Sequence, residues 1–292
     1  MPLVSVVIPV YNYARFLPQA AESLLAQTET DWDCWLVDDG STDDTQAVCE
    51  ALVRRDGRFH YLFQAHRGLP AARNLGLRHA RGNFIQFLDA DDRLEPRKLS
   101  AQCRFLNEHP EIDIVYGEAF YEDGKSRTSA VFSDCRHGAL PSFVRENAAA
   151  VNAFLMRRSV LEEAGPLDES LEAYEDWDFW LRCALKKKTF SYAPAGEDAA
   201  AVVRTHSGSM IQNRLKMLSA LVAVRRKIAP LLPEGEARKI NRHFLIRDEG
   251  RLALEELKAG ATPGRLARIV RAAARELVPG RPRVRRDGRA PE

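Results

Sequence analysis

Strand-like and helix-like segments alternate along the first 120 residues, and this alternation constrains the fold more than any other feature. The segment 3–8 is a near-continuous run of apolar and β-branched residues, typical of a parallel strand buried on both faces, and we expect Pro9 to end it. Further strands are predicted at 34–37, 58–63, 83–88 and 112–116. Helices are predicted at 16–25, 69–80 and 96–108. The alternation predicts an α/β fold, an open and mostly parallel sheet flanked by helices.

The rest of the chain lacks this alternation. Residues 120–150 are predicted to be irregular, with a short strand candidate at 130–132. A helix is predicted at 174–186, where Trp177, Trp180, Leu181 and Ala184 form an apolar stripe at helical spacing. The chain of 292 residues is long enough for one large domain with an appendage. We therefore expect an α/β domain at 1–210 and a C-terminal helical extension at 211–292.

Two clusters of carboxylates follow predicted strands at the point where each strand ends. Asp38 and Asp39 follow the second strand, and Asp89, Asp91 and Asp92 follow the fourth. Ligands of open α/β sheets bind beyond the carboxyl ends of the strands. Closely spaced carboxylates repel one another unless a cation or hydrogen-bond donors lie among them, and Mg²⁺ and Mn²⁺ prefer oxygen ligands. The clusters indicate a site for a metal–diphosphate complex, although acids that only cap helices or face water remain the alternative.

Four motifs carry a resemblance to a known family. The segments 6–12 (VVIPVYN), 37–43 (VDDGSTD), 72–76 (ARNLG) and 87–92 (FLDADD) resemble, in order and spacing, those of the GT-A fold, family 2 glycosyltransferases. The resemblance covers about residues 3–210. It implies an inverting enzyme that uses Mn²⁺ or Mg²⁺ and a nucleotide-diphosphate sugar, with UDP favoured and GDP or dTDP left open.

The same resemblance implies an acceptor class. The acceptor would be a glycan or a lipid-linked molecule, in the synthesis of cell-surface polysaccharide. The Gln-x-x-Arg-Trp motif of processive sugar polymerases is absent, which indicates addition of a single sugar rather than synthesis of a chain.

The resemblance also implies roles for residues at the nucleoside end of the site. Pro9 and Tyr11 would line the base and ribose pocket, and Asp38 would support it. Asp39 would accept a hydrogen bond from the uracil N–H, and Arg73 would lie near the nucleotide and offset its negative charge.

Further roles concern the diphosphate and the sugar. Asp91 would contact the ribose or the sugar, Asp92 would be the main metal ligand, and Asp89 would reach the donor sugar. Arg204 and His206 lie in a segment similar to one that closes over the diphosphate. Arg204 would bind phosphate, and His206 would complete the metal shell.

A further motif supplies a candidate catalytic base. The segment 174–182 resembles the Glu-Asp motif of the same family, in which Glu175 would bind substrate and Asp176 would take the proton of the acceptor hydroxyl. A carboxylate at a helix N-terminus is kept ionised by the helix dipole. The alternative is that these acids only favour the first helical turn electrostatically.

Two rival functions fit the sequence less well. A nucleotidyltransferase should carry a basic, glycine-rich triphosphate loop near the first strand, and residues 9–12 (PVYN) do not form one. A catalytically inactive nucleotide-sugar-binding module is disfavoured because both Asp92 and Asp176 are retained. Dinucleotide-binding, P-loop and G-x-S-x-G motifs are absent from the sequence.

The C-terminal part of the chain is basic. Residues from 201 onward hold 21 basic and 9 acidic side chains, although the whole chain has a net charge of only +2. Residues 263–278 form an amphipathic pattern with arginines on one face, which predicts contact with an anionic membrane surface or packing on the chain's own domain. Nucleic acid is not expected as a partner, since the tail has no aromatic residue for stacking.

The expected location is cytoplasmic, with peripheral contact at the inner face of the membrane. The N-terminus shows no signal-peptide pattern, and no apolar run approaches the length of a spanning helix. The five cysteines have no metal-ligand spacing and are expected to be reduced.

Overall fold

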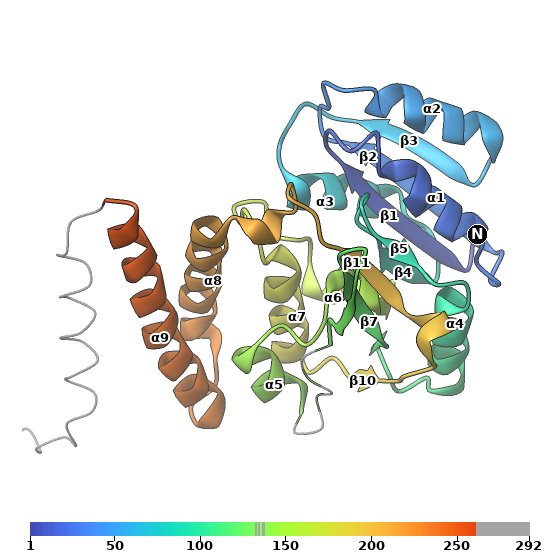
Figure 1. The fold of residues 1–292 in the computed structure, drawn as a ribbon. Coiled ribbons are helices and arrows are strands. Elements are labelled where there is room, and N and C mark those ends of the chain that lie inside the picture. The colour runs from blue at the N-terminus through green and yellow to red at the C-terminus, as the bar shows by residue number, and fades with distance from the viewer. Residues whose placement is uncertain (132, 134, 136–137, 261–292) are drawn as a thin grey trace, which may run out of the picture.

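A seven-stranded sheet forms the centre of the computed structural model, which describes residues 1–131, 133, 135 and 138–260 (Figure 1). Its strand order is β10-β6-β9-β4-β1-β2-β3. The strands are β1 (Val4–Val10), β2 (Trp32–Asp38), β3 (Phe59–Phe63), β4 (Phe84–Phe87), β6 (Ile114–Tyr116), β9 (Phe154–Arg157) and β10 (Phe190–Tyr192). Only β9 runs antiparallel to its neighbours, β4 and β6. The predicted α/β fold with a mostly parallel sheet is therefore confirmed, and β9 is a strand that was not predicted.

Four helices follow the strands as the alternation predicts, α1 (Leu17–Leu25), α2 (Thr45–Arg55), α3 (Leu69–His79) and α4 (Lys98–Glu108). Helix α7 (Glu175–Leu185) lies where the apolar stripe predicts a helix, whereas α5 (Ala139–Arg145) and α6 (Ser159–Ala164) were not predicted. Helix α3 packs closely on β1 and β2 because Gly76 faces them. A Cβ atom at Gly76 would lie 2.5 Å from Val7 and 3.2 Å from Val37, closer than side chains tolerate.

Pro9 does not end the first strand, contrary to expectation. Strand β1 continues to Val10, and Pro9 lies opposite Val37 of β2. Alternate residues of β1 bond to different neighbouring strands. The Val10 carbonyl accepts from the Asp39 N–H on the β2 side, and the Val7 carbonyl accepts from the Leu88 N–H on the β4 side. Pro9 therefore faces the β4 side, where pairing has already stopped at Val7. Its missing N–H removes no bond of the ladder, and the strand tolerates it.

A second sheet of four strands lies beside the first, in the order β5-β11-β7-β8. Its strands are β5 (Arg93–Leu94), β11 (Ala201–Arg204), β7 (Ala119–Glu122) and β8 (Arg127–Ser129). The prediction that 120–150 is irregular was wrong, because this segment contains β8, α5 and part of β7. Of the candidate strand 130–132, Val131 forms only an isolated bridge to Ala149, and residue 132 lies outside the described residues.

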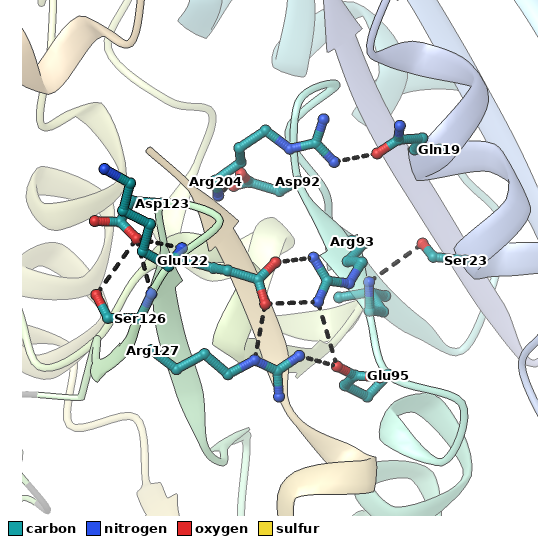
Figure 2. A network of polar contacts seen from close by, with 12 residues as sticks. Gln19, Ser23, Asp92, Arg93, Glu95, Glu122, Asp123, Ser126, Arg127 and Arg204 are labelled. Atoms are coloured by element: carbon teal, nitrogen blue, oxygen red, sulfur yellow. Dashed lines mark hydrogen bonds and ion pairs between the residues drawn. The ribbon is translucent and has the colours of Figure 1, made fainter. Parts of the chain in front are cut away.

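Ion pairs between acidic and basic side chains connect the strands β5, β7 and β8 of the second sheet (Figure 2). Glu122 accepts from Arg93 at 2.5 and 3.1 Å and from Arg127 Nε at 2.9 Å, and Arg127 also reaches Glu95 at 2.7 Å. The antiparallel pairing of β5 with β11 places residue 202 opposite Arg93. Continued by one residue, this register brings Val203 opposite Asp92. The N–H of the next residue, Arg204, reaches the Asp92 carboxylate at 2.8 Å, although the two residues are far apart in the sequence.

Two helices, α8 (Arg214–Ile228) and α9 (Glu236–Lys258), follow the second sheet and pack against α5 and α7 (Figure 1). The all-helical prediction holds for this part of the chain. The division at residue 210 stays a proposal, and the amphipathic segment 263–278 lies outside the described residues. None of the helices in the described ranges is both long and apolar enough to cross a membrane.

Candidate active site

A cleft of about 1150 Å³ opens at the carboxyl ends of β1, β2 and β4 and reaches across to α7 and α8. Ten of the twelve predicted site residues line it, namely Pro9, Tyr11, Asp39, Arg73, Asp89, Asp91, Asp92, Glu175, Asp176 and Arg204. Asp38 and His206 are not among the lining residues. The fold thus gathers side chains from six separate sequence segments into one cleft.

At one end of the cleft, two aromatic rings lie against each other. The Tyr11 and His66 rings stack with their centroids 4.2 Å apart, and Tyr11 is 42% exposed. His66 was missed by the sequence analysis, since it belongs to no recognised motif. An exposed ring beside a polar turn offers a stacking surface for a planar base.

Asp39 anchors the turn that carries His66. Its Oδ1 accepts from the Arg67 N–H at 2.9 Å and from Gln64 Nε2 at 2.6 Å, and its Oδ2 accepts from the Gly68 N–H at 2.8 Å. His66 Nδ1 lies 2.9 Å from the same Oδ2. A base N–H would have to replace one of these donors in order to bond to Asp39.

Asp38 lies behind the cleft, buried, and supports the loop that lines it. Its carboxylate accepts from the Ser41 N–H at 2.8 Å and from the Tyr61 hydroxyl at 3.1 Å. Ser41 Oγ in turn accepts from the Asn12 N–H at 2.9 Å. Asp38 therefore acts on the cleft through the loop that follows β1.

Arg73 joins the acidic turn to α7. This buried side chain of α3 pairs with Asp89 at 2.5 Å and with the buried carboxylate of Glu175. Burial raises the pKa of Glu175 to about 7, and the neighbouring Arg73 opposes that rise. Glu175 lines the cleft, but its carboxylate is directed at Arg73, so its clearest role is to hold the arginine.

Asp176 is partly buried in the first turn of α7. Its Oδ2 accepts from Asn147 Nδ2 at 2.9 Å, and Asn147 was not predicted as a site residue. Burial raises the pKa of Asp176. The residue before the helix, Tyr174, has a left-handed backbone with φ of 60°, an uncommon conformation for a bulky side chain. The strained backbone of Tyr174 and the hydrogen bond from Asn147 together fix the direction in which the Asp176 carboxylate enters the cleft.

The acidic turn is closed by a hydrogen bond from the Asp92 N–H to the Asp89 carbonyl at 3.0 Å. The buried Asp92 carboxylate accepts from the Arg204 N–H at 2.8 Å and from Asn152 Nδ2. Asp91 Oδ2 lies 2.9 Å from His206 Nε2. Burial, and then the charges of Asp91 and Asp89, raise the pKa of Asp92 well above its usual range. The ionised form of Asp92 is therefore unfavourable without a cation, and a bound cation would stabilise it.

The donor set suits a metal that arrives with a diphosphate. Within residues 1–131, 133, 135 and 138–260, no group of three or more His, Cys, Asp or Glu side chains is arranged to hold a metal ion. Mg²⁺ and similar ions bind through one or two carboxylates and complete their shell with water and substrate phosphates. Asp91 and Asp92 on one turn fit that pattern and would hold the ion.

The two residues predicted to assist at the diphosphate lie at the edge of this turn. His206 bonds to Asp91, and its ring packs against Phe16 with centroids 4.6 Å apart. The Arg204 side chain bonds to Gln19 (Figure 2). It also lies over the same Phe16 ring, and its backbone N–H donates to Asp92.

The sequence of this chain is similar to those of known proteins. The model of glycosyl transferase family 2 matches residues 5–164. An uncharacterized glycosyltransferase, EpsJ of Bacillus subtilis strain 168, is 34% identical over 196 residues, covering 62% of this chain and 56% of that protein. The chain thus spans little more than half the length of this relative.

Two solved structures share the fold. TarS of S. aureus, residues 1–349 in complex with UDP-GlcNAc, has a TM-score of 0.68 and 18% identity, covering 94% of this chain and 88% of that one. A mannosyltransferase of Pyrobaculum calidifontis in complex with GDP-Man and Mn²⁺ has a TM-score of 0.64 and 19% identity, covering 94% and 81%. The expected GT-A fold is confirmed.

Proposed function

Because this chain belongs to glycosyl transferase family 2, we propose that it moves a single sugar from a nucleotide-diphosphate donor to a glycan or lipid-linked acceptor, with inversion at the anomeric carbon. One observation carries the proposal. The acidic turn with Asp91 and Asp92 and the carboxylate of Asp176 line the same cleft, and Arg73 links them by ion pairs through Asp89 and Glu175.

The chemistry of the cleft walls supports a position for the donor. Its base would lie against Tyr11 at the end that Asp39 and Asp38 support, and UDP is the favoured nucleotide. Its diphosphate would lie at Asp91 and Asp92 together with Mn²⁺ or Mg²⁺. The ion would stabilise negative charge on the departing diphosphate. The proposal is supported by solved structures of the same fold that hold UDP-GlcNAc, and GDP-Man with Mn²⁺.

Asp176 would act as the general base. The acceptor hydroxyl oxygen attacks the anomeric carbon as its proton passes to the Asp176 carboxylate, and the bond from that carbon to the diphosphate oxygen breaks. The diphosphate leaves with the electron pair. Because the hydroxyl oxygen attacks from the face opposite the diphosphate, the anomeric configuration inverts. The hydrogen bond from Asn147 would aim the carboxylate, and its partial burial would raise its basicity.

The acceptor would enter from the side formed by α7 and α8. This wall of the cleft includes the apolar residues Leu171, Trp177, Met217 and Leu221. Such a surface suits a sugar face or the linker of a lipid-linked acceptor in polysaccharide synthesis. A peripheral location at the inner face of the membrane through the basic tail belongs to the same proposal and awaits its own test.

The test is turnover of UDP-, GDP- and dTDP-sugars with Mn²⁺ or Mg²⁺. Asp176→Asn should reduce transfer by roughly 100- to 10,000-fold and leave UDP binding unchanged. Glu236→Gln is the matched control, because Glu236 is also an acid in the first turn of a helix but does not line the cleft. Full activity of Asp176→Asn would show that Asp176 is not the base. Activity that EDTA does not affect would show that no metal is needed.

Two further measurements separate the rival functions. UDP binding without any transfer or hydrolysis would indicate an inactive nucleotide-sugar-binding module. Release of pyrophosphate from a nucleoside triphosphate in the presence of a sugar phosphate would indicate a nucleotidyltransferase.

A further inference from the structure

We propose that Asn152 is a positioning residue that holds the turn from Asp89 to Asp92 in the geometry that receives the nucleotide diphosphate and its cation. The inference rests on the proposed function of this turn. Asn152 is 1% exposed and is not among the residues that line the cleft. It would therefore act through the two aspartates rather than by contact with the substrate.

The geometry is a two-point clamp. Asn152 lies in the short 3-10 turn η1 (Val151–Ala153), which leads into β9. Its Oδ1 accepts from the backbone N–H of Asp89 at 3.0 Å, and its Nδ2 donates to Asp92 Oδ2. One amide thus binds the first and the last residue of the acidic turn.

The clamp completes the hydrogen bonding of the Asp92 carboxylate. Its other oxygen, Oδ1, accepts from the Arg204 N–H at 2.8 Å. With one donor on each oxygen, the plane of the carboxylate is fixed, and each oxygen keeps a lone pair for a cation. Donors to an ionised carboxylate are strong hydrogen bonds, and outer partners of this kind orient metal ligands.

A buried polar chain fixes Asn152 itself. Gln86 on β4 donates to the Asn152 carbonyl at 3.0 Å, and Lys98 on α4 donates to Gln86 Oε1. Gln102, one turn further along α4, donates to the Ala153 carbonyl at 2.9 Å. A glutamine and a lysine buried without a carboxylate partner cost stability unless they are hydrogen-bonded. Gln86 and Gln102 each donate to a backbone carbonyl of η1, and Lys98 also donates to the Phe154 carbonyl at 3.3 Å, where η1 passes into β9. The network therefore holds this turn in place.

Two variants separate the halves of the clamp. Asn152→Asp keeps the shape and the acceptor for the Asp89 N–H, but it replaces the donor to Asp92 with an oxygen. Asn152→Ala removes both bonds. Asn241→Ala is the matched control, because Asn241 is also buried and donates to one backbone carbonyl, that of Arg225, in the α8–α9 region.

The measurement is calorimetric titration with UDP, once with Mn²⁺ and once with EDTA, at a temperature where thermal unfolding shows each variant to be folded. We expect Mn²⁺-dependent UDP affinity to fall about 10- to 100-fold in both Asn152 variants. Affinity in EDTA should stay within about twofold of wild type, since the base end is untouched. Asn241→Ala should bind as wild type does under both conditions.

Folded Asn152→Asp that binds UDP with Mn²⁺ as tightly as wild type would overturn the inference, and so would equal losses with and without Mn²⁺. If Asn152→Ala does not fold, Asn152→Asp alone decides. A wild-type protein that binds UDP and Mn²⁺ but transfers no sugar would refute the proposed function and leave the effect of Asn152 measurable. A wild-type protein without metal-dependent nucleotide binding would refute both.

Discussion

Replacing Arg225 by methionine tests how the C-terminal helices support the cleft. Arg225 of α8 is 2% exposed and bonds to Asp248 of α9 at 2.7 Å. Its two terminal nitrogens donate to the carbonyls of Val144 at 2.8 Å and Arg145 at 2.9 Å, at the end of α5. One guanidinium therefore joins three helices, and methionine would keep the apolar stem but none of these bonds.

The expected loss in the free energy of unfolding follows from the buried groups that lose their bonds to Arg225. Asp248 is 0% exposed, and breaking a buried ion pair by removing one partner costs about 3–5 kcal/mol. Arg247 at 2.9 Å and Arg251 at 3.5 Å still reach its other oxygen, so we expect the lower end of that range. A loss of about 3 kcal/mol lowers the melting temperature of a chain of this size by roughly 6–12 °C.

The same variant should slow catalysis. The end of α5 leads directly to Asn147, whose amide orients Asp176 at 2.9 Å. With the α5 carbonyls released, we expect kcat to fall while the affinity for the nucleotide stays unchanged. The assays are thermal unfolding, and transfer rates measured well below the melting temperature of the variant.

Arg226→Met is the matched control. Arg226 is the next residue of α8, is 55% exposed and pairs with Glu249 at the surface, so its loss should change stability by less than about 1 kcal/mol. If Arg225→Met melts within about 2 °C of wild type, or no lower than Arg226→Met, then the bonds from Arg225 to α5 and α9 do not stabilise this fold.

Three further predictions concern buried or paired groups. Burial raises the pKa of Asp176, and a base must be ionised, so kcat/KM should fall with decreasing pH in a limb above the ordinary aspartate value of about 4; a limb at or below that value would contradict the assignment. Burial lowers the pKa of Lys98 well below its usual range, so between that pKa and about 10.4 the unfolded chain binds a proton that the folded chain does not. The stability of wild type relative to Lys98→Met should therefore rise with pH. Urea-unfolding measurements in which the two proteins show the same dependence of stability on pH would contradict this. Hydrogen bonds from Arg93 and Arg127 hold the pKa of Glu122 at about 2. The greater stability of wild type over Glu122→Gln should therefore be complete above the ordinary glutamate pKa of about 4.3 and vanish as pH falls through about 2. Identical acid-unfolding curves for the two proteins would disprove this.

Much of the fold was predictable because its signals are local. The apolar run of β1 indicates a strand buried on both faces, and the stripe of α7 indicates a helix with one buried face. Carboxyl ends of parallel strands meet at one edge of a sheet, so the motifs at Asp39 and at Asp89 to Asp92 could be placed in one cleft before any coordinates were known. The resemblance then supplied roles that spacing alone does not give.

Other parts of the site depend on contacts between distant segments. Strand β9 has only four residues and no turn signal of its own, yet it enters the middle of the sheet between β4 and β6. Its entry carries Asn152 under the acidic turn. His66 and Asn147 likewise became visible as site residues only when their loops were placed against Tyr11 and Asp176.

The sequence by itself determined the first parallel strands, the helices that alternate with them and which acids stand at strand ends, because periodicity and hydrophobic patterning are properties of neighbouring residues. The tertiary structure decided which donors those acids meet. Asp92 receives its two donors from residues 60 and 112 positions away, and both arrive through strands whose pairing is non-local. Since the register of such pairs is set by packing of the whole sheet, no local pattern could have assigned Asn152 or the Arg204 N–H to that carboxylate.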